Sequence, residues 1–338
     1  MIVTAHSKSC GYGQPGIFRG ELQFENPVLA EYRWPLYEIR SAKPGPRLCV
    51  SAGVHVNEVS AIEAAVRLQT MFDLDAMAGS VSIIPLINQP ALYRHSEYVC
   101  PIDGKNINST FPGQAGGTFS EALCDAIMRE WCKECDCYID MHGGDLRERV
   151  SKFSIYQQTE NPDVHAQARR LALCFDAEIV LGLPTSYLDK PGRPPTGFAR
   201  QDRIALMSEA GSNGLLEEDA IAFHIDGVLN IAHTLGIVSR KPKEFNNARI
   251  LCNDYLWTHS PATGEFHAES EPGNRVVKGE RLGTIRNFFG EILADVKAEA
   301  DGLLLWRITH PSIKEGDPLL ALAVEERTQN GMAGHGAK

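Results

Sequence analysis

Short apolar runs alternate with segments of helical spacing over the first 236 residues of the chain. The apolar runs predict buried strands at 48–52, 81–87, 137–141, 153–157, 179–183 and 204–209, and the periodic segments predict helices at 58–72, 119–133, 162–175 and 218–236. In the first of these helices, apolar residues recur at helical spacing from Ala61 to Phe72, and Asn57 is a plausible cap. This alternation predicts an α/β fold, with a mixed, mostly parallel sheet that carries helices on both faces.

The pattern changes after residue 245. Residues 1–47 mix short alternating segments with glycine and proline, which is typical of edge strands and turns. From about 248 to 324, short β-like runs such as Asp301-Gly-Leu-Leu-Leu-Trp306 are separated by glycine turns, and no helical period appears. We therefore predict a main domain at 1–245, a small all-β barrel or sandwich at 246–326 and a disordered tail at 327–338.

Composition narrows the class of partner. The 33 basic and 43 acidic residues give a formal net charge of −10, and the basic residues form no block. This distribution argues against a nucleic-acid surface and favours a small-molecule partner. No apolar run approaches the ~20 residues that span a bilayer, and the first residues lack a basic segment followed by an apolar core. We therefore expect a cytoplasmic protein with no membrane partner.

Nine cysteines, an odd number, favour reduced thiols over a disulfide framework. Cys132, Cys135 and Cys137 are close enough in sequence to suggest a thiolate zinc site. The alternative is that the first two end a helix and that Cys137 starts a buried strand, where free cysteine behaves as a small hydrophobe. No second pair lies nearby to complete four ligands, so we favour the structural interpretation.

Three of the predicted strands end beside residues that can bind a metal or move protons. His55 and Glu58 follow the strand at 48–52, His142 follows the strand at 137–141, and Glu209 ends the strand at 204–209. The carboxyl ends of parallel strands meet at one edge of a sheet, where α/β proteins bind their ligands. A catalytic zinc ion takes three protein ligands and keeps a fourth position for water. The pattern predicts one zinc ion per chain, although His55 and Glu58 considered alone could be a solvated pair.

These motifs resemble the aspartoacylase and succinylglutamate desuccinylase family, which is related to the zinc carboxypeptidases. The similar segments are Gly53-Val-His-Val-Asn-Glu58, Asn88-Gln-Pro-Ala91, Asp103-Gly-Lys-Asn-Ile-Asn-Ser-Thr-Phe-Pro-Gly113, Asp140-Met-His142 and Glu209-Ala-Gly, and the likeness extends over most of 48–324. The resemblance implies a zinc-carboxypeptidase-like fold, with His55, Glu58 and His142 as zinc ligands and Glu209 as general base and acid. It also implies a homo-oligomer.

The loop at 88–117 is too long for a simple connection, which favours a functional role, and it departs from the family pattern. The family usually has Asp-Leu-Asn-Arg where this chain has Asn106-Ile-Asn108-Ser109. By the resemblance, these positions bind the substrate, but a serine cannot form the forked ion pair that an arginine makes with a carboxylate. Asn108 could either contact the substrate or hold the loop through its own hydrogen bonds.

Several arginines are candidates for the missing positive charge. The family tends to have an arginine shortly before the Asp-Gly pair that polarises the scissile carbonyl, and Arg94 is the residue that could take this role, unless the role is vacant. Arg147, Arg193 and Arg200 follow sheet elements in the sequence, and any of them could replace the carboxylate clamp lost at Ser109. For each of them, however, we favour the interpretation as a solvated surface charge.

The function predicted from the sequence is zinc-dependent hydrolysis of an amide in an N-acylated amino acid or a similar small molecule. Glu209 would take a proton from the attacking water and deliver it to the leaving amine. One alternative is a metallocarboxypeptidase that acts on short peptides. Another, motivated by Ser109 and Glu97, is a metal-containing binding protein whose catalysis is weakened.

Overall fold

The computed structural model describes residues 1–6, 10–245 and 249–325, and the predicted tail at 327–338 lies outside these ranges. The strands are β1 Ile2–Ala5, β2 Gly16–Gln23, β3 Trp34–Arg40, β4 Arg47–Ala52, β5 Ser80–Ile84, β6 Cys137–His142, β7 Glu148–Val150, β8 Phe153–Gln157, β9 Ile179–Leu183, β10 Ala205–Glu209, β11 Ile250–His259, β12 Gly264–Ala268, β13 Arg275–Val276, β14 Arg281–Arg286, β15 Ile292–Lys297, β16 Gly302–Ile308, β17 Ser312–Ile313 and β18 Pro318–Glu325. The α-helices are α1 Val59–Leu68, α2 Gln89–Arg94, α3 Phe119–Ala126, α4 Pro162–Ala172, α5 Pro194–Ala199 and α6 Glu218–Thr234. A π-helical turn, η4 (Ile127–Trp131), continues α3, and η3 (Ile107–Ser109) is a 3-10 turn in the long loop.

The large sheet is mixed. In the part of the chain that the structure describes, it has 14 strands, in the order β1-β2-β3-β5-β4-β6-β10-β8-β9-β11-β18-β16-β13, with β7 paired to β16. Strands β5, β4, β6 and β10 are parallel neighbours, whereas β1, β2 and β3 join antiparallel and β8 runs antiparallel to β10. The parallel pairing that we expected is found in the two runs β5-β4-β6-β10 and β8-β9-β11, whereas the other neighbours in this sheet pair antiparallel, so the sheet as a whole is not mostly parallel.

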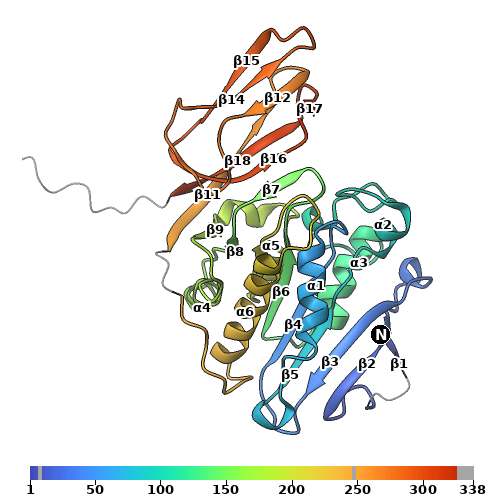
Figure 1. Cartoon of the computed structure of the whole chain (residues 1–338). Helices are drawn as coiled ribbons and strands as arrows, with labels where there is room; N and C mark the ends of the chain where they lie inside the picture. The colour runs from blue at the N-terminus through green and yellow to red at the C-terminus, as the bar shows by residue number, and fades with distance from the viewer. Residues whose placement is uncertain (7–9, 246–248, 326–338) are drawn as a thin grey trace, which may run out of the picture.

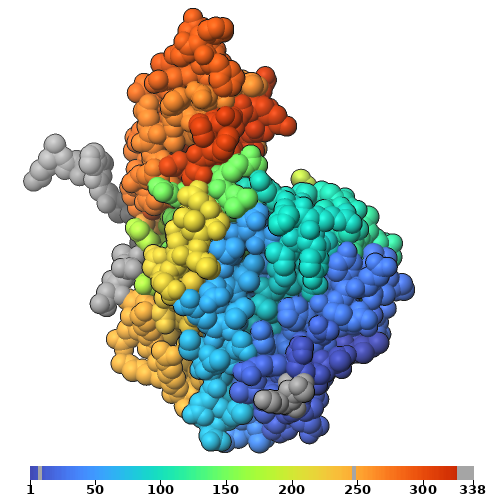
Figure 2. All heavy atoms as spheres, turned by 45° about the vertical axis from the view of Figure 1, so that its right-hand side comes forward, coloured from blue at the N-terminus to red at the C-terminus, as the bar shows by residue number. Residues whose placement is uncertain are grey.

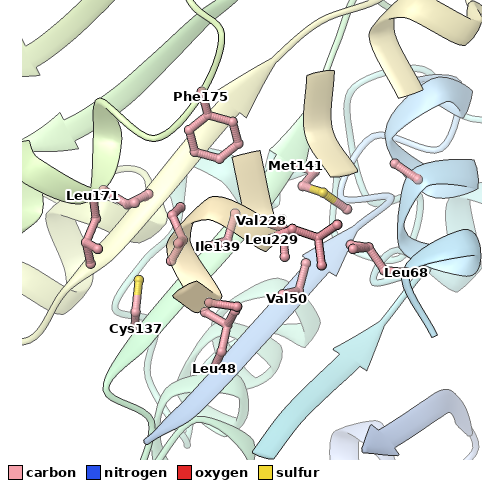
Figure 3. Close-up of a cluster of buried hydrophobic side chains, with 14 of the residues drawn as sticks. Leu48, Val50, Leu68, Cys137, Ile139, Met141, Leu171, Phe175, Val228 and Leu229 are labelled. Carbon is pink, nitrogen blue, oxygen red and sulfur yellow. The ribbon is translucent and has the colours of Figure 1, made fainter. Parts of the chain in front are cut away.

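Helices cover both faces of the central strands, as predicted (Figure 1). On one face, α1 packs over β4 and β6 and against α6, and α4 packs over β8 and β10. Figure 3 shows Leu48, Val50, Ile139 and Val228 meeting in this layer. On the other face, α3, η4 and α5 bury a second cluster that includes Trp34, Trp131 and Tyr138. The residues of both clusters are buried, so close packing supports the central strands from both sides.

Helix α1 starts one residue later than its predicted cap implies. Glu58, not Asn57, occupies the N-cap position, and it makes no capping hydrogen bond with its side chain. The Glu58 carboxylate instead faces the imidazoles of His55 and His142. The prediction that Asn57 caps the helix was wrong. Glu58 occupies the N-cap position, and its side chain contacts His55 and His142 instead of the backbone of the first helical turn.

The C-terminal region is all β in its described residues, as the glycine-punctuated pattern predicted. Strand β11 runs parallel to β9 over its first residues and then pairs with β18, so the main sheet continues into this region. A second sheet, with the strand order β15-β14-β12-β17, packs against it. Figure 2 shows the orange and red lobe rising from the main body. The boundary at 245 stays a prediction, since the sheet crosses it.

In the described ranges, none of the helices combines the length and the apolar character that crossing a bilayer requires.

Candidate active site

Three adjacent parallel strands bring the predicted site residues together. His55 follows β4, His142 ends β6 and Glu209 ends β10, and these strands are neighbours in the order β4-β6-β10. His142 and Glu209 are direct partners in the β6 and β10 pairing. A Cβ added to Gly143 would lie 2.3 Å from the Ala210 carbonyl oxygen, so glycine lets the chain after His142 pass this close to β10.

His55, Glu58 and His142 form a compact buried group. One ligand atom from each lies within 4.8 Å of the others, and all three residues are buried. The Glu58 carboxylate lies between the rings, 2.7 Å from His55 Nδ1 and 2.9 Å from His142 Nδ1. His142 Nδ1 and Glu58 Oε2 have no hydrogen-bond partner of ordinary geometry. Two imidazole nitrogens and a carboxylate that converge in this way fit a metal ion.

The far nitrogen of each imidazole has its own acceptor. His142 Nε2 lies 2.8 Å from Asp140 Oδ2, and His55 Nε2 lies 3.1 Å from Asn106 Oδ1. Asp140 is completely buried, and its other oxygen accepts a hydrogen bond of 2.5 Å from Ser51 Oγ. With a proton on each Nε2, both Nδ1 lone pairs point toward Glu58. Acceptors of this kind orient imidazole ligands and raise their basicity.

The charges in this group are strongly coupled. Burial would raise the pKa of Glu58, but the positive charges of His55 and His142 outweigh it and lower its pKa to about 2. Burial lowers the pKa of His142, but the Asp140 and Glu58 carboxylates raise it well above its usual value. Each histidine must lose a proton before its Nδ1 can bind a metal ion, so metal binding at this group would release protons and would weaken at low pH.

We expect the substitution Asp140→Asn to weaken metal binding by about 10-fold to 100-fold, the usual effect of removing an outer-sphere partner. The amide is nearly isosteric, so the fold should be retained, while His142 loses its anionic acceptor. Competition with a chelator measures the affinity. Asp125→Asn is the matched control, because Asp125 on α3 pairs with Arg129 on η4. Unchanged affinity in Asp140→Asn would contradict the proposed role of Asp140.

Glu209 lies beside this group and lines the same cavity. Burial is the main cause that raises the pKa of Glu209 to about 8, and the Glu58 carboxylate adds to the rise, whereas His142, His55 and Arg193 oppose it. A carboxylate with a pKa near neutrality can accept and return a proton at physiological pH. Its position at the end of β10, next to His142, suits a base that acts on a water molecule at the metal group.

A cavity of about 340 Å³ opens at this edge of the sheet. His55, Glu58 and Glu209 contribute to its polar wall, together with Asn106, Asn108 and Ser109 from the long loop. Asn106 supplies the hydrogen bond that holds the loop turn, because its Oδ1 accepts from the Asn108 backbone nitrogen at 2.9 Å. Asn108 Oδ1, by contrast, is buried without a partner. This arrangement favours a substrate contact over a purely structural role for Asn108.

The four candidate arginines differ in whether their side chains reach the cavity. Arg94 is exposed at the end of α2, donates to the Pro101 carbonyl oxygen at 3.3 Å and does not line the cavity, so its position does not support the carbonyl-polarising role. Arg147 pairs with Glu97 at 2.9 Å, and Arg200 donates to the Leu188 carbonyl oxygen. Arg193 alone of these four lines the cavity.

Arg193 reaches the cavity through a link between two loops. Phe111 and Gly192 exchange backbone hydrogen bonds of 3.0 and 2.8 Å, which join the loop that carries Ser109 to the segment before α5. The Arg193 guanidinium donates to Tyr255 Oη at 2.7 Å and lies over the same ring. The positive charge absent at position 109 is therefore present in the same cavity, supplied by a residue 84 positions later in the chain.

Two further polar residues of the cavity were not predicted. Tyr98 has a φ of 58°, a conformation that a side chain of this size rarely adopts, and its ring packs edge-on against His55. Its hydroxyl donates to Glu148, whose pKa is raised to about 7 by burial. The only sequence signal for Tyr98 was its location in the long loop, and Glu148 had none, because β7 reaches the site through its pairing with β16.

The C-terminal β region supplies an apolar wall. Tyr255, Trp257 and Trp306 line the cavity, and the two tryptophan rings meet edge-to-face at 5.1 Å between centroids. Leu181 and Leu305 continue this surface. The region thus does more than pack against the main body, because one side of the site depends on it.

The site lies at the carboxyl edge of a mixed α/β sheet and consists of a His, Glu and His group, a neighbouring carboxylate and a small cavity. This arrangement is typical of the active sites of metal-dependent hydrolases. The family comparison makes the assignment specific: the succinylglutamate desuccinylase/aspartoacylase catalytic domain matches residues 44–235, and the chain belongs to that family. The resemblance predicted from the motifs is confirmed. The further relation to zinc carboxypeptidases stays a prediction.

Individual relatives agree with this assignment. The N-alpha-acetyl-L-2,4-diaminobutyric acid deacetylase of Halomonas elongata is 24% identical over 284 residues, which are 82% of each chain. The product-bound structure of the ectoine utilization protein EutE (DoeB) from Ruegeria pomeroyi has a TM-score of 0.82 and 22% identity, over 95% of this chain and 98% of that one. A succinylglutamate desuccinylase from Silicibacter has a TM-score of 0.80 and 20% identity, over 96% and 98%. These structural matches show the same fold.

Proposed function

We propose that this protein is a zinc-dependent deacylase, which hydrolyses the amide bond of an N-acylated amino acid or a closely related small molecule. The observation that carries the proposal is the meeting of His55, Glu58 and His142 with Glu209 in one cavity. The family assignment and the deacetylase name of the Halomonas relative support the same reaction class. Location in the cytoplasm and a homo-oligomeric state stay predictions.

The position of each residue indicates its role in the proposed reaction. His55, Glu58 and His142 would hold one zinc ion, because mixed nitrogen and oxygen donors suit this metal. When bound, the ion supplies Lewis acidity for the amide carbonyl and for water. Glu209 takes the proton from the attacking water and delivers it to the leaving nitrogen, so that an amine and a carboxylate are released. Asp140 and Asn106 keep the two imidazoles in orientation.

The cavity indicates the class of substrate. Its lining combines the metal group and Arg193 with an aromatic surface of Tyr255, Trp257 and Trp306, and Arg193 lies directly against the Tyr255 ring. Guanidinium is the group that binds a carboxylate with two parallel hydrogen bonds, so we assign Arg193 the substrate carboxylate that Ser109 cannot bind. Asn108 is placed to contact the same substrate. An N-acyl amino acid with an apolar part matches both the charged and the aromatic residues of this lining.

Replacing Arg193 with methionine should raise KM for N-acyl amino acids by about 10-fold to 100-fold, which corresponds to ~1.5–3 kcal/mol for a hydrogen bond to a charged group. The matching N-acyl amine without a carboxylate should be hydrolysed equally by both proteins. Arg200→Met is the control, because Arg200 does not line this cavity. An equal loss on both substrates would argue that Arg193 acts elsewhere than at the carboxylate.

A direct test of the function combines metal analysis with a substrate screen. Purified protein should contain about one zinc ion per chain and should release amine from N-acetyl, N-succinyl or N-formyl amino acids. Dipeptides with a free amino terminus serve as the counter-substrates, since their preferred cleavage would indicate a metallocarboxypeptidase. Metal-containing protein without turnover on any of these amides would instead support the binding-protein alternative.

A further inference from the structure

Three thiols meet on the face of the sheet that carries α3 and η4. Cys49, Cys132 and Cys135 place their sulfur atoms within 4.8 Å of one another. Cys49 and Cys132 are buried, Cys135 is partly exposed, and all three are free thiols. Cys137, the third cysteine that the sequence suggested for such a group, packs instead in the opposite core cluster. The sequence therefore identified two members of this group and missed Cys49, which lies on β4 far earlier in the chain.

The three sulfurs are carried by two rigid segments. Cys49 lies inside β4, which pairs with β5 on one side and β6 on the other. Cys132 is the C-cap of η4, and the Cys135 backbone nitrogen donates to the Cys132 carbonyl oxygen at 3.1 Å, which closes a tight turn. A turn that presents two cysteines three positions apart is a common arrangement in metal sites. The group is therefore held in place before any ligand binds.

The positively charged guanidinium groups of Arg203 and Arg47 lie close to these three cysteines. Arg203 Nη2 donates to Cys135 Sγ at 3.5 Å and also to the Cys132 carbonyl oxygen. Hydrogen bonds from Cys132 and Cys49 lower the pKa of Cys135, and Arg203 adds to this effect. Arg47 acts electrostatically on Cys49, and its Nε is buried without a hydrogen-bond partner. Burial nevertheless raises the pKa of Cys49 and of Cys132, so it is the spacing of the three sulfur atoms, and not their ionisation, that supports a site here.

We propose that Cys49, Cys132 and Cys135 form a second metal site, separate from the His55 group, which binds one monovalent copper ion through three thiolates. Soft thiolate ligands suit copper(I), zinc and iron–sulfur clusters, and of these copper(I) accepts three ligands in a trigonal site. With metal–sulfur bonds of about 2.3 Å, such a site needs sulfur atoms about 4 Å apart. The observed spacing requires only a small contraction. A structural zinc ion would need a fourth ligand, and the described residues supply three in this group.

The charges of the bound state balance. Each thiol loses its proton to solvent as its bond to the ion forms, and the copper stays monovalent, so no oxidant or reductant is consumed. Three thiolates and one copper(I) ion carry a net charge of −2, which the guanidinium group of Arg203 offsets in part, together with that of Arg47, which also pairs with Glu38. Burial of the ion between β4 and the turn at 132–135 would also shield it from water.

The test is an anaerobic titration of the whole protein with copper(I), in competition with a chromophoric copper(I) chelator. Ultraviolet thiolate-to-copper absorption reports the site. Wild-type protein should bind one equivalent with this absorption, and Cys135→Ser should bind it at least about 100-fold more weakly. Cys137→Ser and His142→Ala are the controls, and both should keep the equivalent. Undiminished binding in Cys135→Ser, or equal loss in Cys137→Ser, would overturn the site.

A second measurement needs no variant and so does not depend on how the substitutions fold. Cys135, Cys10 and Cys174 are all partly exposed, and iodoacetamide followed by peptide mass analysis compares their reactivity. One equivalent of copper(I) should protect Cys135 and leave Cys10 and Cys174 reactive. Equal protection of all three, or a disulfide between Cys132 and Cys135 in place of bound copper, would contradict the proposal.

Discussion

Replacing Glu209 with glutamine is expected to lower kcat for amide hydrolysis by about 10²-fold to 10⁴-fold, the range associated with a general acid and base. The amide keeps the shape of the side chain at the end of β10, but it cannot accept a proton from water. Glu209 is not among the three residues of the metal group, so the zinc content should stay at about one ion per chain. Steady-state kinetics and elemental analysis of the same preparation measure both quantities.

The pH profile gives an independent check on Glu209. The base works only when it is ionised, so kcat/KM should fall as the pH drops below the pKa of Glu209. Burial raises that pKa to about 8, and a bound cation would lower it, so we expect the acid limb below pH 8 in the zinc-loaded enzyme. The limb should disappear in Glu209→Gln. Glu160→Gln, at an exposed position, is the control, and normal turnover in Glu209→Gln would remove this residue from the mechanism.

The meeting of His55, Glu58 and His142 could be predicted because its signal is local. A buried strand followed by His55 and Glu58, and a second strand that ends at His142, each occupy a few consecutive residues. Parallel strands then place their carboxyl ends together without any further information. The same reasoning applied to Glu209, which pairs directly with His142. What remained open was the order of the strands, and the adjacency of β4, β6 and β10 came from the structure.

Residues that reach the site through long-range pairing could not be predicted in the same way. Arg94 was chosen for its position near the motif, yet a residue at the end of α2 points into solvent, whereas Arg193 enters the cavity through the Phe111 and Gly192 bridge. Trp257 and Trp306 line the site because β11 extends the main sheet into the C-terminal region. No spacing in the sequence records either connection.

The cysteines at 132, 135 and 137 also show that spacing in the sequence does not reveal which residues meet in the fold. Cys132 and Cys135 stand out by their spacing, but spacing could not distinguish Cys137 from Cys49 as the third member. Strand geometry decides it, because Cys137 on β6 points to the cluster under α1 and α6, while Cys49 on β4 points to the cluster under α3 and η4. Alternate residues of a strand face opposite sides, so facing depends on register and not on distance along the chain.

Substitution of His142 with alanine is expected to remove the zinc ion and to lower kcat/KM by at least about 10³-fold, because metal catalysis contributes several kcal/mol. The change deletes one of three ligands and also leaves the completely buried Asp140 carboxylate without its imidazole partner. An unpaired buried carboxylate costs about 1–3 kcal/mol or more, so the thermal midpoint should fall as well.

Chelator-treated wild-type protein provides the comparison, since it should lose activity and recover it when zinc is added. His142→Ala should not recover at the same zinc concentration, while Asn108→Ala should keep its metal. A full zinc equivalent in folded His142→Ala would show that the ion is held by other residues.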